Sequence, residues 1–483
     1  MKTRKAISVL LALTMILALV AGCGSSSSSD ASKAASSAVS SLNSSAVPSS
    51  AKSTETSASV SEESSETASA SADFVPVAVP AVPDLGGKTA NEWLLSQSDQ
   101  KPLGGVSPSH LNSRADVYKA LDKVDPADDH ITIAWMMATM GSDFFTELLG
   151  SAKAAADKYG YELIEYNADF DLTAQMDQFE NVMTLDMDYI MCNAMDTDAL
   201  SMYFTQATDA GIPVLVTAPI TAKENYNIVT SVIASSWNMG YKVGAYCAEQ
   251  LWGQFPEGIK VGFLCGQIGF SDTESRACGF ISGYLDKYAE LAGTPYDDKY
   301  AAGVIGYQTW VQLRDKGSAT IEGIMNCVGY VNVGGMDPST AAPASAELIT
   351  AHPDMNLVMF ETGSLGTSII TECINAGYTP GEDIYIAYAA DGEGYICDYV
   401  KSGEVLCSGT NLPYPAGEGL IELIHAIQEE GFDANDLPAN SFTPDYVITK
   451  DNVDQVYSKG DIFAKALEPW QVQTIDEYNA ANS

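Results

Sequence analysis

Two adjacent aromatic residues, Phe144 and Phe145, lie where a predicted strand ends and a predicted helix begins. The apolar run 131–138 is typical of a buried strand, and the segment 144–159 has the apolar spacing of a helix. Neighbouring side chains on a helix point about 100° apart, so the two rings are expected to face different surroundings. We therefore expect one ring to anchor the helix and the other to be free for a ligand.

No recognisable arrangement of catalytic residues accompanies these rings. The sequence contains no nucleophile elbow, zinc-protease motif, phosphate-binding loop or dinucleotide fingerprint. The histidines are scattered, and none is paired with a cysteine or serine (His110, His130, His352 and His425). These observations predict a protein that is not an enzyme and that uses no cofactor or metal.

One acidic segment, residues 169–180, places oxygen-bearing side chains in the register of a calcium-binding loop. Ala174 stands where that loop needs glycine, so an amphipathic helix is the better interpretation. Asp196 and Asp198 similarly have the spacing of carboxylates that begin a helix.

Short apolar runs alternate with helical segments from residue 131 onward. This alternation predicts parallel sheets covered by helices on both faces, and more than ten strands favour two doubly wound lobes over one sheet. Ligands of such sheets bind beyond the carboxyl ends of the strands. The helical segments are 144–159, 172–185, 197–210, 238–254, 272–290, 339–351, 364–376, 393–401 and 415–430.

The N-terminal part has the composition of an export signal followed by a tether. Residues 1–23 combine early cations, a short apolar run and the ending "LVAGC", which resembles a bacterial lipobox. We expect Cys23 to be acylated and to hold the protein on the outer side of the cell membrane; an ordinary secretion signal is the alternative. The Ser-rich residues 24–72 cannot bury enough apolar surface to fold and predict a disordered tether.

The formal net charge of −39 argues against nucleic acid or anionic lipid as a partner, because these would be repelled. It does not identify the ligand, since most acidic side chains are expected on solvated faces. A monomer is the expected form.

The cysteines after Cys23 are spread without any CxxC pair, and most lie in apolar runs. The spacing therefore argues against a zinc site and against thioredoxin-like chemistry. Buried free thiols are the first expectation, and one or two disulfides are the alternative in an oxidising compartment.

Eight motifs in order resemble the type I periplasmic-binding-protein family, specifically the ribose/galactose-type sugar-binding lipoproteins of ABC importers. The likeness covers about residues 131–455. The motifs are "FFTELLGSAKAAADKYGYELIEYNA", "YIMCNAMDTDAL", "AGIPVLVT", "IASSWNMGYKVG", "GFSDTESRACGF", "AHPDMNLVMFETGSLG", "AADGEGY" and "SGTNLPYPAGEGL".

The resemblance implies sugar contacts in the first lobe. Phe144 and Phe145 match a phenylalanine pair of which at least one ring stacks on the sugar, whose C–H faces are apolar. Ser142 takes the place of a family asparagine, and Asn193 matches a binding asparagine that both donates and accepts.

The resemblance also implies contacts from the second lobe and the crossings. Arg276 matches an arginine whose fork holds two ring oxygens, and Asp391 matches the sugar-binding aspartate. Asn411 corresponds to a hinge-side Gln or Asn. Trp237, at the first crossing, is either a stacking platform or hinge packing.

Five positions depart from the family pattern. Its Asp-Arg pair is here Ala218-Pro219, an aromatic residue is Met336, an asparagine is Thr362, and a second aromatic residue is Ala390. We expect a wider or less polar cleft than a ribose site.

The resemblance implies a first lobe of 131–235 and 412–443 and a second of 236–411 and 444–458, joined by three crossings. Residues 73–130 and 459–483 are extensions, and 292–326 is an insertion of unassigned role. The implied function is capture of a sugar for an ABC permease. A sensor for a chemoreceptor, kinase or autoinducer, a nucleoside-binding protein, and a glycan-cleaving enzyme are the alternatives.

Overall fold

The computed structural model describes residues 74–106, 115–124, 130–220 and 227–477. These residues belong to one compact unit, Ser65–Ser483. The predicted export signal, Cys23 and the Ser-rich tether lie outside the described residues.

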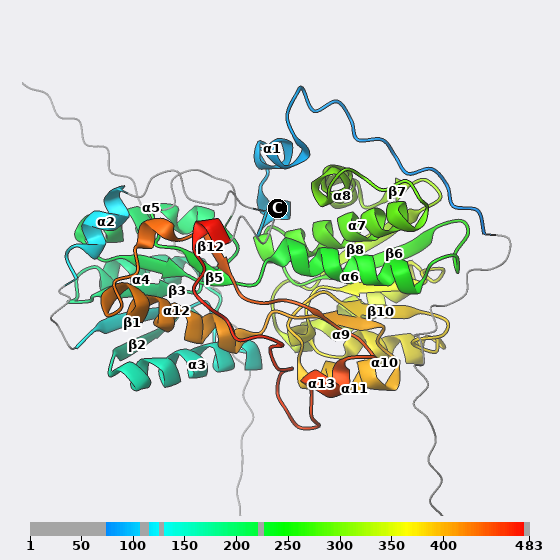
Figure 1. The fold of residues 1–483 in the computed structure, drawn as a ribbon. Helices are drawn as coiled ribbons and strands as arrows, with labels where there is room; N and C mark the ends of the chain where they lie inside the picture. Colours follow the sequence, from blue (N-terminus) through cyan, green and yellow to red (C-terminus); the bar gives the residue numbers. More distant parts are fainter. Residues whose placement is uncertain (1–73, 107–114, 125–129, 221–226, 478–483) are drawn as a thin grey trace, which may run out of the picture. The chain divides into compact units, whose positions relative to one another are not determined.

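The first sheet is parallel throughout and has the strand order β12-β5-β4-β3-β1-β2 (Figure 1). Successive residues of β1 point to opposite faces of the sheet. Trp135 packs in the core beneath α3 and α12, and Met136 packs in the core beneath α4 and α5. Helices therefore cover both faces, as predicted. The elements are β1 Thr132–Met137, α3 Asp143–Tyr159, β2 Glu162–Asn167, α4 Leu172–Val182, β3 Tyr189–Cys192, α5 Thr197–Ala210, β4 Val214–Val216, β5 Ser231–Ile233, α12 Pro413–Gln428, η3 Ala434–Asp436 and β12 Asn440–Phe442.

The second sheet has the order β13-β11-β10-β9-β6-β8-β7 and is parallel except at its two edges. Both edge strands, β7 and β13, run antiparallel to their neighbours, a departure from the predicted parallel sheet. The elements are α6 Ser236–Gln250, β6 Ile259–Cys265, α7 Ser271–Leu291, α8 Lys299–Lys316, β7 Ala319–Ile321, β8 Met325–Asn332, α9 Pro338–Ala351, β9 Leu357–Phe360, η2 Gly363–Leu365, α10 Ser368–Asn375, β10 Tyr385–Tyr388, α11 Gly394–Ser402, β11 Cys407–Gly409, β13 Val447–Ile448 and α13 Val453–Val456.

The insertion is a structural part of the second lobe. It supplies α8, which packs against α7, and the edge strand β7. Its aromatic residues enter the core: Trp310 is fully buried, and Tyr307 is 8% exposed. No sequence motif indicated this, because α8 is apolar on several sides rather than on one stripe.

Helices α6 and α7 of this lobe pack unusually close together at four glycines. A Cβ atom added to Gly240 would lie 2.0 Å from the Arg276 carbonyl oxygen, and one added to Gly279 would lie 2.0 Å from the Trp237 carbonyl oxygen. Gly244 and Gly283 make the equivalent contacts one turn further on. Only glycine allows this approach, which fixes the position of the helix turn that holds Arg276.

The chain passes between the two sheets three times, after β5, after β11 and after β12. This is the predicted architecture of two doubly wound lobes joined by three connections. In the described part of the chain, no helix has the length and apolar character needed to cross a membrane.

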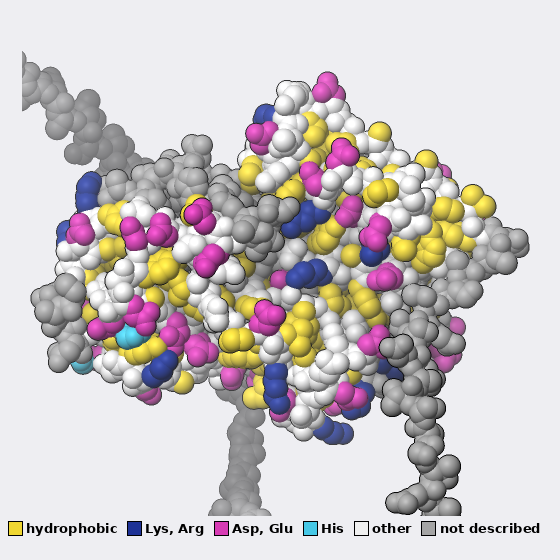
Figure 2. Space-filling view, in the orientation of Figure 1, with side chains coloured by type: hydrophobic (Ala, Val, Ile, Leu, Met, Phe, Trp, Pro, Cys, Tyr) yellow, Lys and Arg dark blue, Asp and Glu magenta, His cyan; other side chains and the backbone are white. Residues whose placement is uncertain are grey.

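The eight described cysteines are all buried free thiols, the first of the two expectations. Burial raises the pKa of the Cys373 thiol to about 12. On the face shown in Figure 2, acidic side chains are scattered over the surface and do not gather in one patch.

Candidate ligand site

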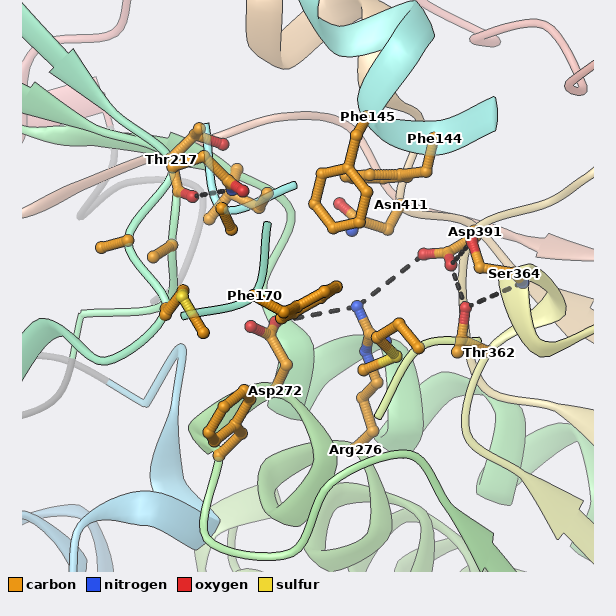
Figure 3. A pocket seen from close by; sticks show the side chains of 18 residues that line it. Phe144, Phe145, Phe170, Thr217, Asp272, Arg276, Thr362, Ser364, Asp391 and Asn411 are labelled. Atoms are coloured by element: carbon orange, nitrogen blue, oxygen red, sulfur yellow. Dashed lines mark hydrogen bonds and ion pairs between the residues drawn. The ribbon is translucent and has the colours of Figure 1, made fainter. Parts of the chain in front are cut away.

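One cavity is lined by loops at the carboxyl ends of strands from both sheets (Figure 3). The empty space inside it, which includes open solvent at its mouth, is about 680 Å³. Six of the eight predicted site residues line it: Phe144, Phe145, Asn193, Arg276, Asp391 and Asn411.

Three of the four phenylalanine rings that line the cavity lie against one another and form an apolar wall. The centroids of Phe144 and Phe145 are 5.3 Å apart with the ring planes at 83°, and those of Phe145 and Phe170 are 5.9 Å apart at 82°. Phe144 is 7% exposed and also packs in the core of the first lobe, whereas Phe145 is only half-buried. Both rings reach the cavity, but Phe145 is the one with a free face.

Phe170 is a site residue that the sequence did not indicate. Its φ of 60° is in the left-handed region, which bulky residues rarely adopt. Its backbone N–H donates to the Ala138 carbonyl at 2.8 Å, which holds the loop after β2 against the end of β1. Strained backbone of this kind often occurs at functional sites.

Asn193 presents an unpartnered acceptor to the cavity. Its Nδ2 donates to the Thr217 carbonyl at 2.9 Å, so the other amide atom must be the oxygen. That oxygen, Oδ1, is buried and has no hydrogen-bond partner, and the same holds for Oδ1 of Asn411 and Oγ1 of Thr217. Buried polar atoms are normally paired, so three such atoms around one cavity indicate a ligand with hydrogen-bond donors.

Arg276 lies opposite the rings among carboxylates. Its NH1 is 3.4 Å from Glu361 Oε1, and its NH2 is 3.8 Å from Asp391 Oδ1 and 3.7 Å from Asp272 Oδ1. Burial opposes the charge of the guanidinium, but the carboxylates outweigh it and the pKa of Arg276 is raised. Nε of Arg276 is buried and has no partner, which leaves a donor for a ligand.

Asp391 is oriented by two hydroxyl groups. Thr362 Oγ1 and Ser364 Oγ both donate to Asp391 Oδ2, the latter at 3.0 Å. The φ of Asp391 is 85°, and the following residues are tied to the C-terminal extension, where Ala464 N–H donates to the Gly392 carbonyl at 2.8 Å. The extension thus braces the loop that holds Asp391.

Two further acids lie beneath this cluster and titrate abnormally. Burial raises the pKa of Glu361 to about 7, although Arg276 opposes the shift. Burial, together with the charge of Asp391, raises the pKa of Glu393 well above its ordinary range. Ser364 Oγ lies 2.8 Å from Glu393 Oε1, so a neutral Glu393 supports the hydroxyl that holds Asp391.

Two predicted site residues lie elsewhere. Ser142 begins helix α3 and is not part of the cavity wall. Trp237 is 1% exposed and packs in the core of the second lobe, stacked on Tyr241 with centroids 5.2 Å apart. The interpretation of Trp237 as a stacking platform is therefore replaced by hinge packing, because the ring has no free face at the cavity.

The residues that depart from the family pattern do not all lie at the cavity. Ala218, Met336 and Thr362 line the cavity, so the lost Asp-Arg clamp leaves space at Ala218. Ala390 is fully buried away from it, beside Met239.

The weaker sequence motifs are structural. Asp196 caps α5 by accepting from the N–H groups of Asp198 and Ala199, as its spacing predicted. Asp171, from the calcium-like segment, caps α4. Within the described ranges, no group of three or more metal-binding side chains is placed to hold an ion.

Comparison with known proteins decides the family. Residues 133–431 match the family described as "periplasmic binding protein domain". The chain belongs to this family of type I periplasmic binding proteins. Its members bind solutes and are not enzymes.

Proteins similar to this chain include an import binding protein and solute-binding proteins of known structure. The chain is 24% identical over 294 residues to the ribose import binding protein of Salmonella typhimurium, covering 60% of this chain and 83% of that protein. It has the fold of a galactofuranose-binding protein (17% identity, TM-score 0.54, 67% of this chain and 96% of the other). It also has the fold of a solute-binding protein from Actinobacillus succinogenes solved with D-allose (19% identity, TM-score 0.52, 67% and 99%).

Proposed function

We propose that this periplasmic binding protein captures a neutral sugar or cyclic polyol in the cavity between its lobes and delivers it to an ABC importer. The single observation behind this proposal is the facing arrangement of the phenylalanine wall and the Arg276–Asp391 cluster. Aromatic rings pack on the apolar face of a sugar ring, while the rim hydroxyls need both donors and acceptors.

The polar atoms of the cavity match such a ligand. Oδ1 of Asn193 and Oδ1 of Asn411 accept from hydroxyl groups, and Nε of Arg276 donates. A sugar hydroxyl does both, so one ligand can satisfy all three. An anionic ligand would meet Asp272 and Asp391 beside the one arginine and would be disfavoured.

Delivery would follow from binding itself. A ligand that contacts both lobes stabilises the arrangement in which the lobes enclose it, and the permease recognises that form. We further propose that acylated Cys23 and the Ser-rich tether keep the protein at the outer face of the membrane, near its permease. The resemblance of "LVAGC" to a lipobox supports this anchoring.

A thermal-shift screen of the purified full chain tests the proposal. The panel contains ribose, arabinose, galactose, allose and myo-inositol, with adenosine and an amino-acid mixture as contrasts. Ligand at 100 times its Kd stabilises the folded state by about 2.7 kcal/mol. The proposal requires a sugar or polyol to raise the melting temperature; a shift with adenosine or an amino acid alone would refute it.

A further inference from the structure

The N-terminal extension is anchored on the second lobe by buried side chains. Leu94 and Leu103 are fully buried in the core of that lobe. The ring of Trp93 packs edge-on against Tyr307 at 5.9 Å. Asp99, in the segment that follows α1 (Ala90–Leu95), forms an ion pair of 2.7 Å with Arg314 of α8. This segment is therefore attached to the second lobe by an ion pair as well as by apolar packing.

From this anchor, the extension continues to the edge of the ligand cavity. Trp237 N–H donates to the Gly104 carbonyl at 3.0 Å, at the point where the chain crosses between the lobes. A Cβ atom added to Gly104 would lie 2.9 Å from Pro219 Cβ and 2.3 Å from Ser271 Oγ. Gly104 therefore packs directly against Pro219, beside Ala218 of the cavity wall.

Lys101 connects the two lobes at this place. Its Nζ lies 3.2 Å from Asp196 Oδ2, at the start of α5 in the first lobe. The same Nζ donates to the Gly269 carbonyl in the loop before α7 of the second lobe. Ser271 Oγ donates back to the Lys101 carbonyl at 3.2 Å. One ammonium thus joins loops that belong to different sheets.

A small recess around Lys101 adjoins the ligand cavity. The two share Ala194, Met195, Ala218 and Asp272 as lining residues. An ammonium group has three N–H donors, and the two contacts above use two of them. Through these shared residues, the recess that contains Lys101 lies directly beside the ligand cavity.

We infer that residues 99–106 are a clasp at the mouth of the ligand cavity, and that Lys101 holds its two sides together. Lys101 is a positioning residue that links Asp196 of the first lobe to Gly269 of the second. This link favours the arrangement in which the lobes enclose the cavity. The inference rests on the proposed function only in treating this cavity as the ligand site. The link between the lobes itself needs no ligand.

The test measures the distance between the lobes without ligand. Met202 of α5 and Ile374 of α10 are 55% and 52% exposed and belong to different lobes. Replacing both with cysteine in the full chain carrying Cys23→Ser allows spin labelling, because the eight described native cysteines are buried. Pulsed electron paramagnetic resonance then gives the distribution of distances between the labels.

Two variants and one matched control decide the outcome. Lys101→Met removes the ammonium charge. Asp196→Asn removes the carboxylate charge of the same ion pair, and its amide oxygen still caps α5. Each should raise the population of longer distances about two- to fivefold, the effect of a partly exposed ion pair. Lys260→Met breaks the 2.6 Å pair with Asp354 within the second lobe and should change nothing.

Unchanged distributions in Lys101→Met and Asp196→Asn would overturn the clasp, as would an equal change in Lys260→Met. Thermal melting of each variant shows that the protein remains folded. Because no ligand is present, this result is separate from the outcome of the sugar screen. A chain that binds a sugar but shows no change here would retain the proposed function and lose the clasp.

Discussion

Replacing Glu361 with glutamine tests the electrostatics beneath the ligand site. Glu361 is fully buried, and burial raises its pKa from 4.5 to about 7. The folded protein therefore binds this proton more tightly than the unfolded chain does. Stability from the group is fully present below pH 4.5 and is lost as the pH rises through about 7.

The size of the effect follows from the two pKa values. Each unit of pKa difference corresponds to about 1.4 kcal/mol, so the two values imply about 2 kcal/mol lost between pH 5.5 and 8.0. Glutamine has the same shape and does not titrate, so Glu361→Gln should lack this loss. Glu393 has a raised pKa in both proteins, and its contribution cancels in the comparison.

Urea denaturation of both proteins at a series of pH values measures the difference. The free energy of unfolding of the original protein should fall relative to Glu361→Gln as the pH rises. If the difference in free energy of unfolding between the two proteins stays constant across this range, Glu361 does not titrate as described. The same conclusion follows if the original protein becomes more stable than Glu361→Gln as the pH rises. Glu382→Gln, at an exposed position after α10, is the matched control and should behave like the original protein.

The remaining predictions concern packing, binding and anchoring. Phe145→Ala should weaken sugar binding more than tenfold in calorimetry with little loss of stability, whereas Phe144→Ala should also lower the free energy of unfolding by about 3 kcal/mol, because that ring is in the core. Asp391→Asn should weaken binding about tenfold while the melting temperature without ligand changes little; equal affinity would contradict the site. Gly240→Ala should lower the melting temperature, since its Cβ would meet a backbone carbonyl at 2.0 Å. Labelling of cells with an alkyne fatty acid should mark the protein, and Cys23→Ser should abolish the mark.

Much of the fold could be predicted because buried parallel strands are apolar throughout. The run 131–138 contains β1, and the helix predicted over 144–159 differs from α3 by one residue. The edge strand β12 was harder, because its three residues are too few to show a period. The antiparallel pairing of β7 also depends on the insertion folding onto the sheet.

Most of the site could be predicted because its residues match a family pattern, and the places of two of them also agree with the sheets. Asn193 directly follows β3 and Asp391 comes three residues after β10, at the carboxyl ends of strands, where parallel sheets bind ligands. Phe170 was missed because its left-handed backbone is imposed by contacts with the end of β1. For Trp237 the sequence left a stacking platform and hinge packing open, since its position in the chain does not reveal the stacking with Tyr241.

Lys101 was beyond the reach of sequence reasoning for another reason. It is separated by 95 positions from Asp196 and by 168 from Gly269, and only the packing of the extension on the second lobe brings the three together. A single lysine in a polar stretch has no pattern that indicates such a role.

Isothermal titration of the full chain with the sugar that gives the largest thermal shift shows whether the cavity is the ligand site. We expect one ligand per chain, with affinity reduced more than tenfold in Phe145→Ala and unchanged in Asp354→Asn, a carboxylate exposed on the second lobe. Binding that is equally strong in all three proteins would show that the ligand lies elsewhere. The absence of heat for every sugar and polyol, with binding of adenosine, would contradict the proposed function itself.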